Sequence, residues 1–333
     1  MKMNFKINKQ IDFMKQAKYL AVLSIVALVV SVASVFTKGM DYGIDFAGGV
    51  LMEVQADEVI DMAQMRQKMD ALNLGEVSLQ SVGTQGTEML IHVLVDTSDK
   101  SAQETVIASV KETLGDGIEY RRTEVVGPKV GDELKEKSII ASLFALLAIA
   151  IYIWFRFEWQ FSVACLLAVA FDLIVTVGLF SLTGLDFNMT VVAGLLSLAG
   201  YTTNDKVVNF DRIRENLKLY RKMPIPELLN KSVNDTLSRT ILTSITTMMM
   251  LVILIFMGGE TLFGFSVCLL VGIILGTYSS IYIAVPLLQL FDLRNVGRED
   301  ETGPYAEAAK YEREAKKAPL DPMACRGCGS CKK

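Results

Sequence analysis

Histidine is almost absent from this sequence, because the 333 residues contain only His92. Catalysis by serine, histidine and aspartate needs a histidine base, and zinc and haem sites commonly use histidine ligands, so these kinds of site are nearly excluded. Charged residues make up only 21% of the chain and the net charge is −4, which argues against a basic nucleic-acid-binding protein. The five cysteines all lie outside residues 37–137, so a disulfide framework is excluded there.

Long apolar runs dominate the rest of the chain. Hydrophobic residues make up 51% and the mean hydropathy is +0.37, which is too apolar for an ordinary soluble protein. A helix that crosses a bilayer needs about 20 mostly apolar residues. Six segments meet this requirement: 19–36, 138–155, 161–183, 189–208, 239–258 and 262–290. Since stretches such as Ile139–Phe155 are apolar on every side, unlike the amphipathic helices of soluble proteins, we predict a polytopic α-helical membrane protein with six transmembrane helices.

Basic residues indicate how these helices are oriented. Residues 1–18 carry five lysines and residues 209–239 carry seven basic residues, while the short connections after the third and fifth spans carry none. By the positive-inside rule, the parts outside the spans are predicted as a cytoplasmic N-terminus 1–18, a cytoplasmic loop 209–237, a cytoplasmic tail 291–333 and a periplasmic insert 37–137. The loop is expected to be partly helical, broken at Pro224 and Pro226, and to lie along the inner membrane surface.

The insert separates the first helix, 19–36, from the five-helix domain 138–290. The first helix is long for a signal peptide and no clear A-x-A site follows it, so we expect a retained anchor. Alternation and helical spacing within the insert predict strands at 44–54, 76–82, 88–95 and 117–126 and helices at 58–72 and 102–114. This βαββαβ order is typical of a ferredoxin-like α+β domain. The insert is acidic, with 10 basic and 19 acidic residues, and His92 is expected to be a structural histidine in a strand.

Among the ionisable side chains inside the predicted spans, three matter most: Asp172, Asp205 and Arg239. Such groups are costly in lipid and are functional candidates by default. At about 1.5 Å per residue, Asp205 and Arg239 lie roughly 25 and 28 Å from the outer ends of neighbouring antiparallel spans, which predicts an ion pair toward the inner side. Asp205, balanced between desolvation and a nearby arginine, would take and release a proton as its surroundings rearrange.

Small and polar residues recur on the same helices. Tyr201 and Asn204 belong to a stripe on the fourth span at helical spacing, and Thr243 lies on the fifth span beyond Arg239. Such stripes have two explanations: close packing of the helices, or support for a water chain beside a buried carboxylate. Both interpretations stay open. The candidate ion-conduction residues are Asp205, Arg239, Asp172, Asn204, Tyr201 and Thr243.

A series of short motifs follows in order along the chain. These are Asp45-Phe46-Ala47-Gly48-Gly49, Val126-Gly127-Pro128, Gly200-Tyr201-Thr202-Thr203-Asn204-Asp205, Phe210-Asp211-Arg212, Thr236-Leu237-Ser238-Arg239-Thr240, Gly258-Gly259-Glu260 and Gly276-Thr277-Tyr278-Ser279-Ser280. Together, over about residues 35–290, they resemble the SecF branch of the SecD/SecF family of bacterial protein-export membrane proteins, part of the RND superfamily.

The resemblance implies an accessory subunit of the Sec translocase, in the bacterial inner membrane, that uses a proton or sodium motive force to assist protein export and is not an enzyme. It matches Asp205 and Arg239 to ion-conduction positions. It also implies a SecD-like subunit and the SecYEG channel as partners, with YajC-like and SecA-like components, unfolded secreted polypeptide and membrane lipid, and no required cofactor. Half of an RND-type small-molecule exporter is the alternative.

Three positions depart from the family pattern. Lys206 follows Asp205 where a small hydroxyl residue is usual, and is expected either to neutralise Asp205 or, more favourably, to reach the inner interface. Asn209 stands where an apolar residue is usual. Phe171 precedes Asp172 where histidine is common, which leaves sodium coupling open.

The tail ends in three cysteines spaced as C-x2-C-x2-C, Cys325, Cys328 and Cys331. Three thiolates are one ligand short of a closed zinc or iron–sulfur site, so a fourth ligand would have to come from elsewhere. Metal binding, redox-labile thiols and no function all remain open for this tail. A metal- or redox-sensing membrane protein is accordingly a further alternative function.

Overall fold

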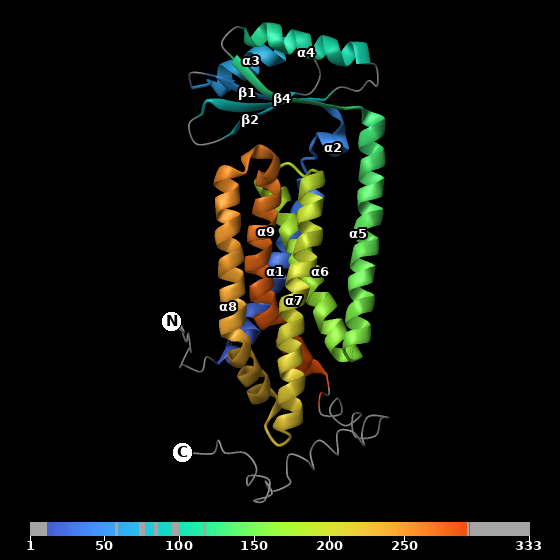
Figure 1. Ribbon diagram of the computed structural model, residues 1–333, viewed down its shortest axis with the longest axis vertical. Helices are drawn as coiled ribbons and strands as arrows, with labels where there is room; N and C mark the ends of the chain where they lie inside the picture. The colour runs from blue at the N-terminus through green and yellow to red at the C-terminus, as the bar shows by residue number, and fades with distance from the viewer. Residues whose placement is uncertain are drawn as a thin grey trace, which may run out of the picture.

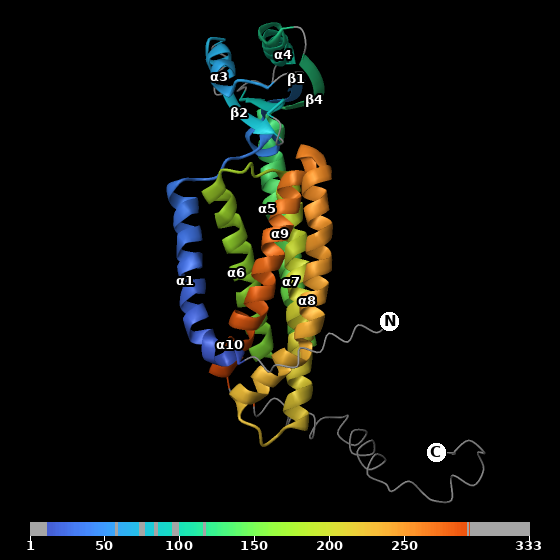
Figure 2. The same cartoon turned by 90° about the vertical axis from the view of Figure 1, so that its left-hand side faces the viewer.

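A bundle of long helices carries a small α+β domain at one end (Figure 1). The computed structural model describes residues 12–56, 59–72, 77–82, 86–94, 100–115, 118–291 and 293. We call the end of the bundle that faces the sheet the sheet end, and the opposite end the hairpin end. Turned by 90°, the bundle shows α1 on one side and α8 on the other, with α6, α7 and α9 between them (Figure 2).

Among the described residues, five helical segments are long and apolar enough to cross a membrane. They are α1 (Phe13–Thr37), α5 (Pro128–Arg156), α6 (Trp159–Thr183), α8 (Ile225–Met257) and Thr261–Leu290, which comprises α9 (Gly259–Ser279), a π-helical turn η1 (Ser280–Ala284), α10 (Val285–Leu287) and η2 (Leu288–Leu290). Large apolar side chains of α1, α5 and α8 remain exposed, Leu143 by 63% for example. Such a surface suits lipid better than water.

The fourth predicted span, 189–208, lies within α7 (Met189–Leu219), which is too polar to count among those five. Its polar stretch Thr202–Lys206 faces other helices in part, since Thr202 and Lys206 are buried. The segment 209–237, expected as a partly helical loop, is helical on both sides of a short turn. Residues up to Leu219 continue α7. The next helix, α8, begins at Ile225, with Pro224 as its N-cap and Pro226 in its first turn, where proline is tolerated.

The insert has the βαββαβ order expected from its sequence. Its elements are β1 (Gly49–Ala56), α3 (Met62–Asp70), β2 (Val77–Val82), β3 (Glu88–Val93), α4 (Lys100–Leu114) and β4 (Ile118–Val126). The four strands form one antiparallel sheet in the order β2-β3-β1-β4. Alternate residues of β1 and β3, among them Met52, Val54, Met89 and Ile91, pack with α3 and α4 on the side away from the bundle.

The first strand begins later than predicted. Residues 44–47 form a helical turn, α2 (Ile44–Ala47), and β1 starts only at Gly49. Gly48 and Gly49 have φ values of +75° and +118°, which side chains rarely adopt, so these glycines permit the sharp turn from α2 into the sheet. An apolar run alone did not reveal this turn.

Candidate functional site

Asp205 lies in a cage of hydroxyl groups from two neighbouring helices. Thr240 of α8 donates a hydrogen bond to Oδ1 at 2.9 Å, and Ser280 donates one to Oδ2 at 2.6 Å. Ser280 begins the π-helical turn η1, and such turns are frequent at functional sites. The carboxyl group is half-buried. Both its oxygens are therefore held by neutral donors.

The expected ion pair between Asp205 and Arg239 does not form in this structure. Thr240 faces Asp205, while Arg239, the preceding residue of α8, is exposed. Consecutive residues of a helix point about 100° apart, so only one of the two can face the same neighbour. Depth along the helix was compatible with the pair, but rotation about the helix axis was not.

Asp172 and Lys206 form a fully buried ion pair. Nζ of Lys206 on α7 donates to Oδ2 of Asp172 on α6 at 2.7 Å, and both side chains are 0% exposed. Both expectations for Lys206 are wrong: it neither neutralises Asp205 nor reaches the interface. A buried carboxylate offers the ammonium a partner that the apolar surroundings do not.

The remaining candidate ion-conduction residues lie along the α7–α8 surface. Tyr201 contacts Thr247 through their hydroxyl groups at 3.4 Å, and Thr243 donates to the backbone of its own helix. Asn204, Thr243 and Arg239 are exposed on this surface. Asn204 and Gly200 also line a groove of about 400 Å³ between α5 and α7. The sequence stripe is thus partly an outer surface, not wholly a buried channel wall.

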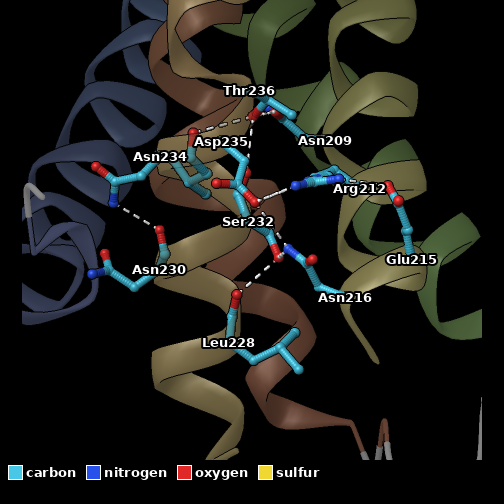
Figure 3. A network of polar contacts seen from close by, with 11 residues as sticks. Asn209, Arg212, Glu215, Asn216, Leu228, Asn230, Ser232, Asn234, Asp235 and Thr236 are labelled. Atoms are coloured by element: carbon cyan, nitrogen blue, oxygen red, sulfur yellow. Dashed lines mark hydrogen bonds and ion pairs between the residues drawn. The ribbon is translucent and has the colours of Figure 1, made fainter. Parts of the chain in front are cut away.

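The motif Phe210-Asp211-Arg212 at the hairpin end joins α7 to its neighbours, and Figure 3 shows the contacts of Arg212. Asp211 receives two hydrogen bonds of 2.8 Å from Arg156 at the end of α5. Arg212 donates to Asp235 of α8 at 2.7 Å and to Glu215 at 2.7 Å. These ion pairs hold the α7–α8 hairpin as an extension of the bundle.

Two polar pairs lie inside the same hairpin (Figure 3). Thr236 donates to the Oδ1 atom of Asn209 at 2.6 Å, and Asn216 donates to Ser232 at 2.8 Å. The Asn209 side chain is buried, so its polar group needs this partner. The departure from the family pattern at Asn209 is explained locally, because Thr236 on the facing helix satisfies its amide oxygen.

At the sheet end, the motifs at residues 45–49 and 126–128 meet. Gly48 packs so closely on Pro128 that an added Cβ would lie 3.0 Å from the proline Cα. The Asp45 carboxylate accepts a hydrogen bond from the backbone N–H of Met189, at the start of α7, at 2.9 Å. Phe46 stacks on Phe187. A carboxylate is favourable at a helix N-terminus, so Asp45 anchors the insert to α7. Gly127 precedes Pro128 as the N-cap of α5.

A polar cavity of about 320 Å³ lies between the sheet and the bundle. His92 and Arg122 line it from the sheet, and Arg122 donates to Thr261 at the start of the last span. Asp186, from the connection before α7, accepts a hydrogen bond from Gln80 at 3.2 Å. Burial raises the pKa of Asp186, while His92 and the Gln80 hydrogen bond oppose that shift. His92 also lies 3.4 Å from the Gly48 carbonyl oxygen, which fits a structural role.

The predicted metal site falls outside the described residues, since Cys325, Cys328 and Cys331 lie beyond residue 293. Within the described ranges, no three side chains of histidine, cysteine, aspartate or glutamate come together as metal ligands. Cys165 and Cys268 are free and buried in the bundle.

Long apolar helices, charged groups buried between them and an α+β domain at one end define a polytopic membrane protein of the transport class. The chain belongs to the SecD/SecF family of protein export membrane proteins. Residues 105–294 match the family model "Protein export membrane protein SecD/SecF, C-terminal", and residues 33–58 match the "SecD/SecF GG Motif".

Individual relatives agree with this assignment. The chain is 43% identical over 284 residues to the protein translocase subunit SecF of Rickettsia bellii, covering 84% of this chain and 93% of the relative. It is 41% identical over 285 residues to SecF of Desulfurispirillum indicum, covering 84% and 90%. The crystal structure of SecDF from Thermus thermophilus superposes with a TM-score of 0.78 at 35% identity, covering 87% of this chain but only 39% of the SecDF chain.

Sequence reasoning missed three features of the site. The Asp172–Lys206 pair, the Arg156–Asp211 pair and the contact of Ser280 with Asp205 each join residues far apart in the chain. Asp172 was noted as a charge inside a predicted span, and Lys206 as a departure from the family pattern. Their pairing was not, because it depends on which faces of α6 and α7 meet.

Proposed function

We propose that this chain is an accessory subunit of the bacterial Sec translocase that uses a proton or sodium gradient across the inner membrane to assist protein export. The observation that carries the ion coupling is the Asp205 cage. Its carboxyl group is bonded to two neutral hydroxyl donors on different helices, Thr240 and Ser280. Loss or gain of a charge at Asp205 changes both contacts at once.

The energy available is sufficient for a conformational change. One elementary charge that crosses 100 mV releases about 2.3 kcal/mol. A change of charge at Asp205 shifts an equilibrium only if one helix arrangement holds the charged form better than the other. Since α8 and η1 each supply one donor, a shift of either helix changes how well the charged form is held. The segment Thr261–Leu290 contains Ser280, and its first residue, Thr261, lines the cavity below the sheet. It therefore joins the Asp205 site to that cavity.

The membrane arrangement belongs to the same proposal. We place α7 as a sixth span, with neighbouring helices shielding Thr202, Thr203 and Lys206 of its polar stretch from lipid. The sheet order and βαββαβ chain order fit a ferredoxin-like domain. The basic residues of the α7–α8 hairpin favour its cytoplasmic placement, together with both termini, and leave the insert periplasmic.

A SecD-like subunit is the proposed partner, and the exposed polar surface on α7 and α8 is its proposed contact. Asn204, Arg239, Thr243 and Thr246 are exposed there, at positions within the membrane-spanning length. Polar and charged groups of this kind face protein or water in membrane proteins, not lipid. The solved SecDF chain, of which this chain matches about two-fifths, supports a second half of comparable size.

Family membership is the support for the wider set of partners. These are the SecYEG channel, SecA-like and YajC-like components and the unfolded polypeptide that is exported. No local feature of the described residues favours the small-molecule exporter. The cysteine tail as a zinc or iron–sulfur site stays a prediction.

The function is tested by measuring export into membrane vesicles with and without an imposed ion gradient. We expect the gradient to accelerate export only in vesicles that contain this chain with its partner. Vesicles that lack the chain, but hold equal amounts of the channel, are the control. An equal acceleration in both sets of vesicles would contradict the proposal.

The partner surface is tested by cross-linking. A cysteine at Thr246 (Thr246→Cys) is expected to give a cross-linked product with a tagged SecD-like subunit in membranes, because it replaces an exposed residue of the polar surface. The matched control is Phe144→Cys on α5, a residue that is 68% exposed within an apolar surface. Products of equal yield from both positions, or from Phe144→Cys alone, would place the partner elsewhere.

A further inference from the structure

Asp172 and Asp205 are acids within the predicted membrane spans, and their surroundings differ. Asp172 is paired with the ammonium of Lys206, and both side chains are 0% exposed. In the other ion pairs of the described residues, each side chain is at least 20% exposed. Asp205, the neighbour of Lys206 in sequence, is half-buried and is held by hydroxyl groups.

The surroundings of Asp172 have the composition of a small-cation site. The buried hydroxyl groups of Thr202 and Ser279 lie beside its carboxylate. Its Oδ1 atom is buried and has no hydrogen-bond partner among the described residues. Gly276 lets Thr202 pack closely against this carboxylate, because an added Cβ would lie 2.2 Å from Cγ2 of Thr202 and 3.7 Å from Oδ2 of Asp172. Carboxylate and hydroxyl oxygens are ligands for hard cations, and the ammonium of Lys206 occupies the place of such an ion.

Exchange of this ammonium for an external ion is unfavourable. If the pair separated, Lys206 would be left as an uncompensated charge among buried residues, which strongly destabilises a protein interior. Its own backbone position on α7 keeps it beside Asp172. Asp205 carries no such obstacle, because its present partners are hydroxyl groups that also bond a protonated carboxyl group.

We propose that Lys206 is a tethered cation that fills a monovalent-cation site at Asp172, and thereby confines ion exchange to Asp205. The inference rests on the proposed ion-coupled function. It assigns Asp172 a fixed charge in place of the ion-conduction role that the sequence predicted. It also gives a reason for lysine at a position where a small hydroxyl residue would leave the Asp172 site open to a mobile ion.

The test uses dicyclohexylcarbodiimide, which modifies protonated carboxyl groups within membranes. The full-length chain is treated in its native membranes, digested, and the modified residues are located by mass spectrometry. We expect modification of Asp205 and at least tenfold less at Asp172. In Lys206→Met and Lys206→Thr, Asp172 should become modified to a similar extent as Asp205, and sodium should protect it in Lys206→Thr, where the added hydroxyl supplies a further oxygen ligand.

Two further variants serve as controls. Lys222→Met removes an exposed lysine just beyond the same helix and should leave the pattern of the native chain unchanged. Lys206→Arg keeps a cation and should keep Asp172 unmodified. This variant provides a result even if Lys206→Met does not accumulate in the membrane. Modification of Asp172 in the native chain would overturn the inference. So would its absence in Lys206→Met and Lys206→Thr when Asp205 is still modified.

The labelling is independent of export. If the native chain shows the expected difference between the acids while Asp205→Asn exports normally under a gradient, the proposed function fails and the assignment of Lys206 stands. If export depends on Asp205 but Asp172 is modified as readily as Asp205 in the native chain, the proposed function stands and the assignment of Lys206 fails.

Discussion

Asp205→Asn is expected to abolish the part of export that an ion gradient adds, so that the variant exports with a gradient only as fast as without one. The amide has nearly the size of the carboxyl group. Its oxygen still accepts a hydrogen bond from one of the two hydroxyl groups of Thr240 and Ser280, and its NH2 group donates to the oxygen of the other. It cannot change its charge, however, and so cannot respond to the gradient. Export rates in membrane vesicles with and without an imposed gradient measure this effect.

The control is Glu215→Gln on the same helix. Glu215 bonds Arg212 at the hairpin end and is exposed, so its loss removes a negative charge from α7 without touching the bundle interior. Surface ion pairs contribute only about 0–1 kcal/mol, so this variant should keep both its fold and its gradient response. A full gradient response in Asp205→Asn, at native amounts of chain in the membrane, would refute the ion-coupling role.

Gly49→Ala is expected to destabilise the insert and its attachment to the bundle. At φ of +118° any side chain is strained, and an added Cβ would lie 2.4 Å from the backbone oxygen of Val93 on the paired strand β3. Strain of this kind costs about 1–3 kcal/mol before the clash is counted. The strand pairing must shift to relieve it. A lower midpoint of thermal unfolding and faster proteolysis within residues 37–137 measure the effect.

Gly127→Ala is the matched control for that substitution. It lies in the neighbouring family motif, but its φ is −69° and an added Cβ meets no atom within 4 Å. Its expected effect on stability is within about 0.5 kcal/mol, as for other unconstrained surface positions. Equal losses of stability in the two variants would show that the turn between α2 and β1 does not depend on the backbone conformation of Gly49.

The insert could be predicted well because its pattern is local. Alternating apolar residues in β2 and β3, and helical spacing in α3 and α4, follow from which side of each element faces the core. The start of β1 was missed since its cause is the backbone of Gly48 and Gly49, which turns the chain where an apolar run reads as a strand. The polar pairs inside the α7–α8 hairpin, such as Asn216 with Ser232, could not be predicted, because each joins residues of two different helices.

The sequence by itself determined that this is a membrane protein with an α+β insert, which family it resembles, and which charged residues are out of place in apolar segments. Those properties are set by composition, by spacing along the chain and by the cost of charge in lipid. Only the tertiary structure decided that Lys206 neutralises Asp172, that Ser280 and Thr240 hold Asp205, and that Arg239 is left exposed. Spacing fixes the depth of a residue along its helix, but packing between helices fixes the direction in which its side chain points.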